Sequence, residues 1–419
     1  MKLHNFFLSL LLCAVTLLCL LILPAQARAE ISGDYTYEVS NGAATITAAD
    51  PSISGSVEIP DTLGGYPVTG IGKEAFAFCS ELRGVVIPDS VTGIGAYAFY
   101  GCTNLTSVAI SEHVTSIGDS AFAYCFSLTG IWVDENNQTY SSDAEGVLFN
   151  KEMTMLLQAP GGLQGGYTIP DGVTDMGSLA FCGCFGLSNV TVPDSVGCIG
   201  DDAFQYCTGL TGIWVDENNQ TYTSDTKGVL FNKEMTMLLQ APGGLQGSYI
   251  IPDGVTDMGM HAFSSCINLT DVTIPGGMGS IGDDAFRNCV NLRSITIPDS
   301  VTNIGESAFL NCNKLNAVYF GGSEGQWSQI SVGDDNDNFV CATVYYNIGI
   351  AGDFDGNGFV DVDDVLMLLL YVSMQDEFPL DAEADFDGNG EVDVRDVVAL
   401  LLHVSMPDRF PLQLTKEEL

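Results

Sequence analysis

A period of 23 residues runs through the middle of the chain, and it restricts the possible folds more than any other feature. An Ile-Gly or Met-Gly pair recurs eight times, each time followed by Ala-Phe, then Cys, then Leu. Successive pairs are 23 residues apart except at two places, where the spacing is 59. A fixed period of this length predicts a solenoid, in which each unit buries its apolar face only against its neighbours.

A single unit indicates what each coil contains. Val108 and Ile110 alternate with Ala109, which predicts a short strand. The Pro-Asp-Ser of residues 88–90 predicts a turn, and the Ala98-Phe99 segment predicts a tight helical or 3₁₀ turn. The expected fold class is therefore a β-rich solenoid of short strands and helical or 3₁₀ turns.

Eight cysteines recur at one position of the repeat, and a ladder of stacked thiols explains them better than a disulfide framework or a metal site. Buried free cysteine behaves as a small hydrophobic residue, whereas soft-metal sites need local clusters of ligands. The eight are Cys79, Cys102, Cys125, Cys184, Cys207, Cys266, Cys289 and Cys312.

Two inserted blocks, about residues 134–169 and 216–251, account for the two longer spacings. They are nearly identical at an offset of 82 residues, which indicates duplication of a block of repeats. In each block apolar segments flank an Asn-Lys-Glu sequence, at 150–152 and at 232–234, and this pattern predicts a hairpin.

One outward strand position holds the candidates for a ligand surface on the solenoid. It is occupied by Trp132, Trp214 and Tyr319 in three of the units. The two tryptophans could form a strip that binds sugar or protein, yet both immediately precede an inserted block. Packing beneath the hairpins is the favoured interpretation, and the ligand strip remains the alternative.

The N-terminus predicts export. Residues 1–29 combine a basic start, an apolar run over 6–23 and small residues that allow cleavage after Ala27 or Ala29, which is the pattern of a secretory signal peptide. A retained membrane anchor is the alternative. The signal carries two of the 13 basic residues, Lys2 and Arg28, so 11 basic and 53 acidic residues remain. That balance argues against nucleic-acid binding, which needs a basic face.

Two near-copies of an acidic loop lie 32 residues apart, at 353–364 and 385–396. Oxygen-bearing side chains stand at loop positions 1, 3, 5, 9 and 12, and glycine stands at position 6. This is the pattern of an EF-hand loop, in which Ca²⁺ takes about six to eight oxygens, so we predict two bound Ca²⁺ ions. The predicted ligands, with the position-7 residues acting through their carbonyls, are Asp353, Asp355, Asn357, Phe359, Asp361, Asp364, Asp385, Asp387, Asn389, Glu391, Asp393 and Asp396.

The segment that follows each loop is unusually apolar, over 365–372 and 397–404. A surface helix of a small domain carries a single apolar stripe, and a module of about 60 residues cannot bury apolar side chains on every side. We therefore expect part of these two helices to stay exposed and to bind a partner.

These motifs carry two family resemblances. The pattern Ile-Pro-Asp-Ser-Val-Thr-x-Ile-Gly-x-x-Ala-Phe-x-x-Cys-x-x-Leu, over residues 87–105, resembles the BspA-type leucine-rich repeat of bacterial surface proteins. Units of this kind cover about residues 55–347. Residues 350–412 resemble a type I dockerin, which is a small all-α module with two EF-hand-like Ca²⁺ loops, each followed by a helix.

The dockerin resemblance implies a partner, the cohesin domain of a scaffoldin, within a cellulosome-like assembly. In that family the cohesin contacts come from loop positions 10 and 11 and from the following helix. The matching residues of this chain are Val362, Asp363, Leu369, Leu370, Val394, Arg395, Leu401 and Leu402. Many dockerins place Ser or Thr at positions 10 and 11, and this chain does not.

We expect a signal peptide (1–29), an N-terminal strand cap (30–70), a solenoid with two hairpin insertions and a C-terminal cap (71–347), a dockerin (350–412) and a tail (413–419). The function predicted is that of a secreted, non-catalytic recognition protein whose solenoid binds an unknown protein or polysaccharide. The alternatives are a cell-surface adhesin and a glycoside-active enzyme. No residue is assigned a catalytic role, because the Gly-x-Ser-x-Gly string over 321–325 lies in the predicted cap, without alternating strands and helices around it.

Overall fold

The computed structural model describes residues 29–346, 362–373 and 392–405. The chain divides into two compact units. Among the described residues, unit 1 comprises 29–163 with 177–180, and unit 2 comprises all the others. The predicted signal peptide up to residue 28, most of both Ca²⁺ loops and the tail lie outside the described residues.

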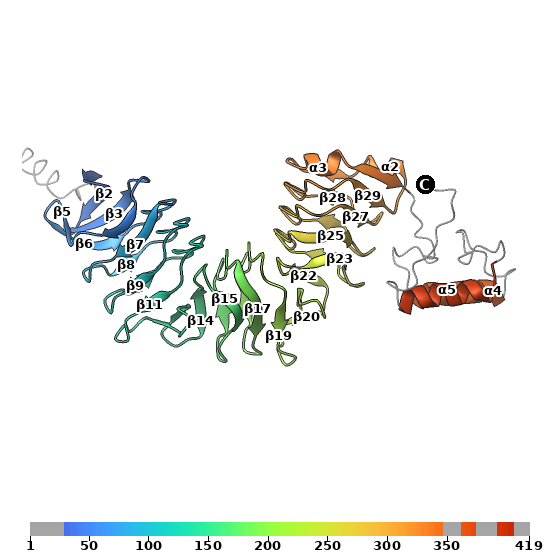
Figure 1. The fold of residues 1–419 in the computed structure, drawn as a ribbon, viewed down its shortest axis with the longest axis horizontal. Coiled ribbons are helices and arrows are strands. Elements are labelled where there is room, and N and C mark those ends of the chain that lie inside the picture. The colour runs from blue at the N-terminus through green and yellow to red at the C-terminus, as the bar shows by residue number, and fades with distance from the viewer. Residues whose placement is uncertain (1–28, 347–361, 374–391, 406–419) are drawn as a thin grey trace, which may run out of the picture. The chain divides into compact units, whose positions relative to one another are not determined.

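Unit 1 is built from short strands (Figure 1). They are β1 (Glu30–Ser32), β2 (Tyr35–Ser40), β3 (Ala43–Ala49), β4 (Gly55–Glu58), β5 (Thr62–Leu63), β6 (Tyr66–Ile71), β7 (Leu82–Val86), β8 (Gly93–Ile94), β9 (Val108–Ile110), β10 (Ser116–Ile117), β11 (Ile131–Val133), β12 (Tyr140–Ser142), β13 (Leu148–Asn150) and β14 (Met155–Gln158).

Unit 2 repeats the same kind of coil and also contains helices. Its strands are β15 (Gln164–Thr168), β16 (Asp175–Met176), β17 (Gly186–Val192), β18 (Cys198–Ile199), β19 (Ile213–Val215), β20 (Tyr222–Ser224), β21 (Leu230–Asn232), β22 (Met237–Gln240), β23 (Gln246–Ile250), β24 (Asp257–Met258), β25 (Asn268–Thr273), β26 (Ser280–Ile281), β27 (Ser294–Ile297), β28 (Asn303–Ile304), β29 (Ala317–Phe320), β30 (Ser331–Val332) and β31 (Thr343–Tyr346). Its helices are α2 (Glu324–Trp327), α3 (Asp337–Val340), α4 (Val362–Ser373) and α5 (Val394–Ser405).

A typical coil contributes one longer strand and one two-residue strand, and the two kinds form separate parallel ladders. In unit 1 the longer strands pair in the order β4-β7-β9-β11, and the short strands β8 and β10 extend a sheet that begins with β1, β2, β3 and β6. In unit 2 the longer strands form the sheets β15-β17-β19 and β23-β25-β27-β29-β31, while β26, β28 and β30 form a short-strand ladder. Val108 and Ile110 of β9 are buried, which confirms the strand predicted there.

The Ala-Phe segments form turns that are not helical, so the helical or 3₁₀ turn predicted for them is wrong. The residue before Ala-Phe has a positive φ in each of the eight coils, as at Tyr97 with φ 57°. A left-handed residue interrupts the right-handed dihedrals that a helical turn requires. These positions, which we call the left-handed row, are Glu74, Tyr97, Ser120, Leu179, Asp202, His261, Asp284 and Ser307.

Phenylalanine rings stack from coil to coil in the interior of each unit. In unit 1 the centroids of Phe76 and Phe99 are 5.0 Å apart, and those of Phe99 and Phe122 are 5.6 Å apart. In unit 2 Phe263 and Phe286 stack with centroids 5.0 Å apart. Because each of these rings packs against its equivalent in the next coil, the 23-residue period of the sequence becomes an apolar column within each run of regular coils.

The repeated cysteines form the predicted thiol ladder. All eight are buried and carry thiols rather than disulfides. The Sγ of Cys102 donates to the carbonyl of Phe76 in the preceding coil at 3.1 Å, and Cys289 bonds to Phe263 in the same way. Burial raises the pKa of Cys79 and of Cys312 to about 12, so both thiols stay protonated at neutral pH.

The glycine of the Ile-Gly pair lies where adjacent coils approach most closely. A side chain at Gly95 would place its Cβ 2.5 Å from the carbonyl carbon of Gly72 in the preceding coil. Close approach of backbone to backbone is a position that only glycine fills without displacement. The same close approach to backbone occurs at Gly72 and Gly118, whereas a Cβ at Gly282 would lie 3.6 Å from its nearest neighbour, so the requirement for glycine holds in some repeats and not in all.

Each inserted block forms the predicted hairpin and adds a third strand that the sequence pattern did not indicate. In unit 1 β13 pairs antiparallel with both β12 and β14, and in unit 2 β21 pairs in the same way with β20 and β22. The buried side chain of Asn137 donates to two backbone carbonyls of the preceding coil and accepts two backbone N–H bonds within the block. Asn219 repeats all four bonds in unit 2.

The last coil of unit 2 is covered by α2, α3 and β31. The indole of Trp327 lies against the rings of Phe320 and Phe339, with centroids 5.2 and 5.5 Å away. Ser323, the serine of the Gly-x-Ser-x-Gly string, caps α2 and forms a capping box with Gln326. This serine therefore has a structural role at the start of a helix.

Candidate functional site

The two tryptophans of the predicted ligand surface are the middle residues of equivalent strands, β11 in unit 1 and β19 in unit 2. Trp132 is 44% exposed and Trp214 is 40% exposed. Each indole lies against a glycine two residues earlier, Gly130 or Gly212, where any side chain would collide with the ring. The rings therefore pack on their own coils and keep an exposed side, and neither is buried beneath a hairpin.

Tyr319 lies on the outward face of the last sheet of unit 2 and stacks on Tyr345, with ring centroids 5.3 Å apart. The register continues this row from Tyr319 through Thr296 and Thr273 to Ile250. The row presents aromatic faces and hydroxyl groups to solvent, a combination suited to protein recognition because one side chain offers both apolar area and hydrogen bonds.

The helices α4 and α5 pack against each other through a small apolar core. Its buried members are Val365 and Leu368 of α4 and Val397 and Leu400 of α5. A second set of apolar residues, at corresponding positions of the two helices, stays exposed. These are Val362, Leu366 and Leu369 in α4 and Val394, Val398 and Leu401 in α5. No helix among the described residues has the length and apolar character needed to span a bilayer.

Four of the eight predicted partner-contacting residues belong to this exposed set, namely Val362, Leu369, Val394 and Leu401. Leu402 is half-buried, and Arg395 is exposed and pairs with Asp393 at 2.7 Å. The side chains of Asp363 and Leu370 lie outside the described part of the chain.

Three of the predicted Ca²⁺ ligands are described. Asp364 and Asp396, at position 12 of the two loops, are fully buried at the beginnings of α4 and α5. An Oδ of Asp396 accepts a hydrogen bond from the backbone N–H of Asp393 at 2.8 Å, and the guanidinium of Arg395 lowers the pKa of Asp393. The other predicted ligands, Asp353, Asp355, Asn357, Phe359, Asp361, Asp385, Asp387, Asn389 and Glu391, lie outside the described residues.

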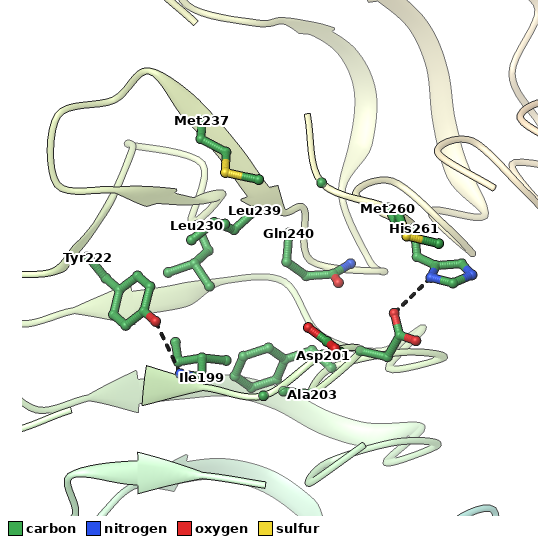
Figure 2. Close-up of a pocket in the computed structure, with 14 residues that line it drawn as sticks. Ile199, Asp201, Ala203, Tyr222, Leu230, Met237, Leu239, Gln240, Met260 and His261 are labelled. Carbon is green, nitrogen blue, oxygen red and sulfur yellow. Dashed lines mark hydrogen bonds and ion pairs between the residues drawn. The ribbon is translucent and has the colours of Figure 1, made fainter. Parts of the chain in front are cut away.

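A cavity of about 360 Å³ opens in unit 2 beside the second inserted block (Figure 2). Its walls come from residues 199–204, from the strands of the inserted block and from residues 259–261. At one side the hydroxyl of Tyr222 accepts a hydrogen bond from the N–H of Ile199 at 3.1 Å. This bond gives the N–H of Ile199 in β18 a partner at the place where the second inserted block interrupts the regular succession of coils.

An imidazole lies between two carboxylates at the other side of the cavity. His261 Nδ1 is 2.8 Å from an Oδ of Asp202, and its Nε2 is 3.4 Å from an Oδ of Asp284. Asp284 also pairs with Arg287 at 2.9 Å. The carboxylate of Asp202 raises the pKa of His261, burial opposes this shift, and Asp284 adds to it.

The sequence analysis singled out none of the residues of this cavity. Asp202, His261 and Asp284 are consecutive members of the left-handed row in unit 2. Comparing the residue before Ala-Phe in successive repeats would have shown the run of Asp, His and Asp. The period, used to find the fold, therefore also contained the signal for this cluster.

Coils with one longer and one two-residue strand, stacked around columns of phenylalanine, cysteine and leucine, define a leucine-rich-repeat β-solenoid. The chain matches the family described as "BspA type Leucine rich repeat region" in six copies, over residues 54–147, 166–227 and 246–330. These segments cover more than half of the 419 residues. The chain belongs to the BspA-type leucine-rich repeat family.

Solved structures similar to this chain include other leucine-rich repeat proteins. One from Eubacterium ventriosum is 25% identical, with 71% of this chain and 72% of that chain covered and a TM-score of 0.43. A leucine-rich cell surface protein from Faecalibacterium prausnitzii is 27% identical, with coverage of 73% and 97% and a TM-score of 0.38. The pneumococcal vaccine antigen PcpA is 17% identical, with coverage of 77% and 88% and a TM-score of 0.41. No curated protein matches the chain.

Proposed function

We propose that this chain is an exported, non-catalytic recognition protein that docks through its C-terminal Ca²⁺ module onto a cohesin domain of a scaffoldin, within a cellulosome-like assembly. The observation that carries the proposal is the duplicated set of exposed apolar residues on α4 and α5. Apolar side chains left in solvent at equivalent positions of two helices indicate a surface that a partner covers.

Calcium fits the donors that the chain offers. Asp364 and Asp396 are carboxylates buried at the starts of their helices, and a buried charge is stable only when it is paired or coordinates a metal. Residues 350–412 hold 15 acidic and two basic residues. The loops at 353–364 and 385–396 would each hold one ion through the predicted ligands, and Ca²⁺ would supply the positive charge that these carboxylates need to converge.

The solenoid is the recognition element of the proposal. Its row from Ile250 to Tyr345 offers an extended, partly apolar surface, and repeat solenoids use such surfaces to bind proteins. The stacked pair of Tyr319 and Tyr345 also favours a second candidate function, that of a cell-surface adhesin. In that case the solenoid would bind a surface protein directly and the Ca²⁺ module would only stabilise the chain.

Binding of the full-length chain to an array of cohesins, with Ca²⁺ or with EGTA, tests the proposal. We expect tight binding in Ca²⁺ and none in EGTA. The double variant Leu369→Glu/Leu401→Glu should weaken binding by about 30-fold or more, because interface residues of this kind contribute about 2 kcal/mol or more. The matched control Tyr319→Ala in the solenoid should bind normally.

Two outcomes would overturn docking. Absence of binding to every cohesin in Ca²⁺ would do so, and so would binding that EGTA leaves unchanged. Capture of a host or microbial surface protein that is lost in Tyr319→Ala but kept in the double leucine variant would instead support the adhesin.

A further inference from the structure

One glutamine in the wall of the cavity of unit 2 has an acceptor oxygen without a protein partner. The side chain of Gln240 is 8% exposed, and its Nε2 donates to the carbonyls of Ala241 at 3.1 Å and Ala262 at 3.3 Å. These bonds fix the orientation of the amide and leave Oε1 as an acceptor. Within the described residues, Oε1 accepts no hydrogen bond.

Further acceptors gather at the same end of the cavity. Figure 2 shows the amide oxygen of Gln240 on the side that faces Asp201, and Asp202 also lines the cavity. None of the 14 lining residues is Lys or Arg, and the imidazole of His261 is already held between two carboxylates. An acceptor on a largely buried side chain such as Gln240 is unfavourable without a donor, and Asp201, which is exposed, adds negative charge at the same end of the cavity. This arrangement therefore calls for a ligand that brings N–H donors and positive charge.

The remaining walls are apolar. Met237, Leu239 and Met260 line the cavity (Figure 2). Methionine side chains are flexible and polarisable, so they adapt to the shape of an alkyl group. The ligand therefore needs an apolar stem as well as a cationic end, and a volume of about 360 Å³ is in the range of small-ligand sites.

We infer that this cavity binds a primary ammonium or guanidinium group carried on an alkyl stem, with the cation between Gln240 Oε1, Asp201 and Asp202 and the stem against the two methionines. The group could come from a lysine or arginine side chain of a partner protein, or from a free alkylamine. The site lies apart in sequence from the C-terminal module, so its test is independent of the docking proposed above.

The first inserted block provides an internal control for this inference. There Gln158, the equivalent of Gln240, is 3% exposed, and its Oε1 is enclosed without a protein partner. Leu179 stands in place of His261 and Ser120 in place of Asp202. The first block therefore keeps the glutamine and, in Asp119, the equivalent of Asp201, but it lacks the carboxylate of Asp202 and the imidazole of His261.

Calorimetric titration of the full-length chain at about 0.15 M salt tests the inference with two probes of equal stem length. They are Nα-acetyl-lysine methylamide and its uncharged counterpart Nα-acetyl-norleucine methylamide. We expect the lysine probe to bind at least about tenfold more tightly, since a hydrogen bond to a charged group contributes about that factor or more. Asp201→Asn should weaken binding of the lysine probe about tenfold, and the matched variant Asp119→Asn in the first block should leave it unchanged.

A second variant, Asp202→Ser/His261→Leu, installs the pair found in the first block and should also abolish the preference for the lysine probe. Butylammonium identifies the source of the ligand. Weaker binding of butylammonium than of blocked lysine indicates a peptide ligand, and equal binding indicates a free amine. The inference is overturned if neither probe binds, if norleucine binds as tightly as lysine, or if Asp201→Asn keeps full affinity.

Discussion

The two inserted blocks are nearly identical in sequence and fold alike, yet the coils that flank them present different side chains. Both form a three-stranded hairpin held by a buried asparagine, Asn137 or Asn219. In both, a tyrosine hydroxyl accepts the N–H of the isoleucine one coil earlier, at 2.7 Å from Tyr140 to Ile117 and at 3.1 Å in the second block. The shared residues therefore specify the shape of the block.

The difference lies in the coils that flank each block. Ser120 and Leu179 in unit 1 correspond to Asp202 and His261 in unit 2, and all four have left-handed backbones. The same two backbone positions thus carry uncharged residues in one copy, and in the other they carry a carboxylate and an imidazole beside a cavity. The framework is the same in both copies, and the residues of the left-handed row determine what it presents.

The largest expected effect would test whether the two frameworks are equivalent. Phe149 and Phe231 are fully buried at matching positions of the two blocks. Phe149→Ala and Phe231→Ala should each lower the free energy of unfolding by about 3–5 kcal/mol, because the ring is lost and a cavity remains. Chemical denaturation measures both, and hydrogen exchange assigns each loss to its own unit.

Met155→Ala is the control for the first block, since this side chain is exposed and its removal should cost less than about 0.5 kcal/mol. A cost below about 1 kcal/mol in only one of the two phenylalanine variants would contradict the equivalence of the blocks.

The period predicted the core because every repeat makes the same contacts. Val108, Ile110 and Cys102 were placed inward correctly, since each recurs at a fixed offset. The turn at Ala98-Phe99 was predicted wrongly, because Tyr97 adopts a left-handed conformation that glycine would have signalled. The second ladder of two-residue strands was missed because two residues are too few to show alternation.

The candidate site was predicted less completely than the fold, for a physical reason. The Ca²⁺ ligands and the apolar helices are local motifs. The helices form where the sequence placed them, as α4 and α5, and the role of all twelve predicted ligands remains a prediction. His261 contacts Asp202 and Asp284, which are distant in sequence, so no local motif marks the cluster. Only the stacking of coils brings these side chains together.

The next largest effect is a pH dependence of stability, which we expect for the coils beside the second block more than for those beside the first. The pKa of His261 is raised in the folded state, so protonated His261 stabilises the folded chain. This stabilisation is fully present below the unfolded pKa of about 6.5 and is lost as pH rises through the folded pKa. His261→Leu should therefore destabilise unit 2 by on the order of 1 kcal/mol more at about pH 6 than at about pH 9. Denaturation at a series of pH values measures this difference.

The matched variant Leu179→His places an imidazole in the left-handed row with Ser120 before it and Asp202 after it, so it lacks the counterpart of the Asp202–His261 pair and keeps only a counterpart of Asp284. It should therefore add less stability at low pH than His261 does. If the stability difference between the parent chain and His261→Leu were the same at both ends of the pH range, the ion pair with Asp202 would contribute nothing, and the two copies would differ in sequence alone.

The smallest effect concerns Lys227, which stands where the first block has Glu145. Its Nζ donates to the carbonyl of Ser248 at 3.0 Å and lies 5.9 Å from the centroid of the Tyr249 ring. The hydroxyl of Tyr249 in turn donates to Asp225 at 2.7 Å. Lys227→Glu removes the cation and adds a carboxylate near Asp225, so unit 2 should lose about 0.5–1 kcal/mol, a loss that salt reduces.

Lys227→Met separates the stem from the charge, because it keeps the apolar chain over the ring and removes only the ammonium. We expect Lys227→Met to fall between the parent chain and Lys227→Glu in urea denaturation at low salt, and the three to converge as salt is added. Equal stability of Lys227→Glu and the parent chain at low salt would show that the surface charge at this position is free to vary. In that case the copies would differ in energy only at the left-handed row.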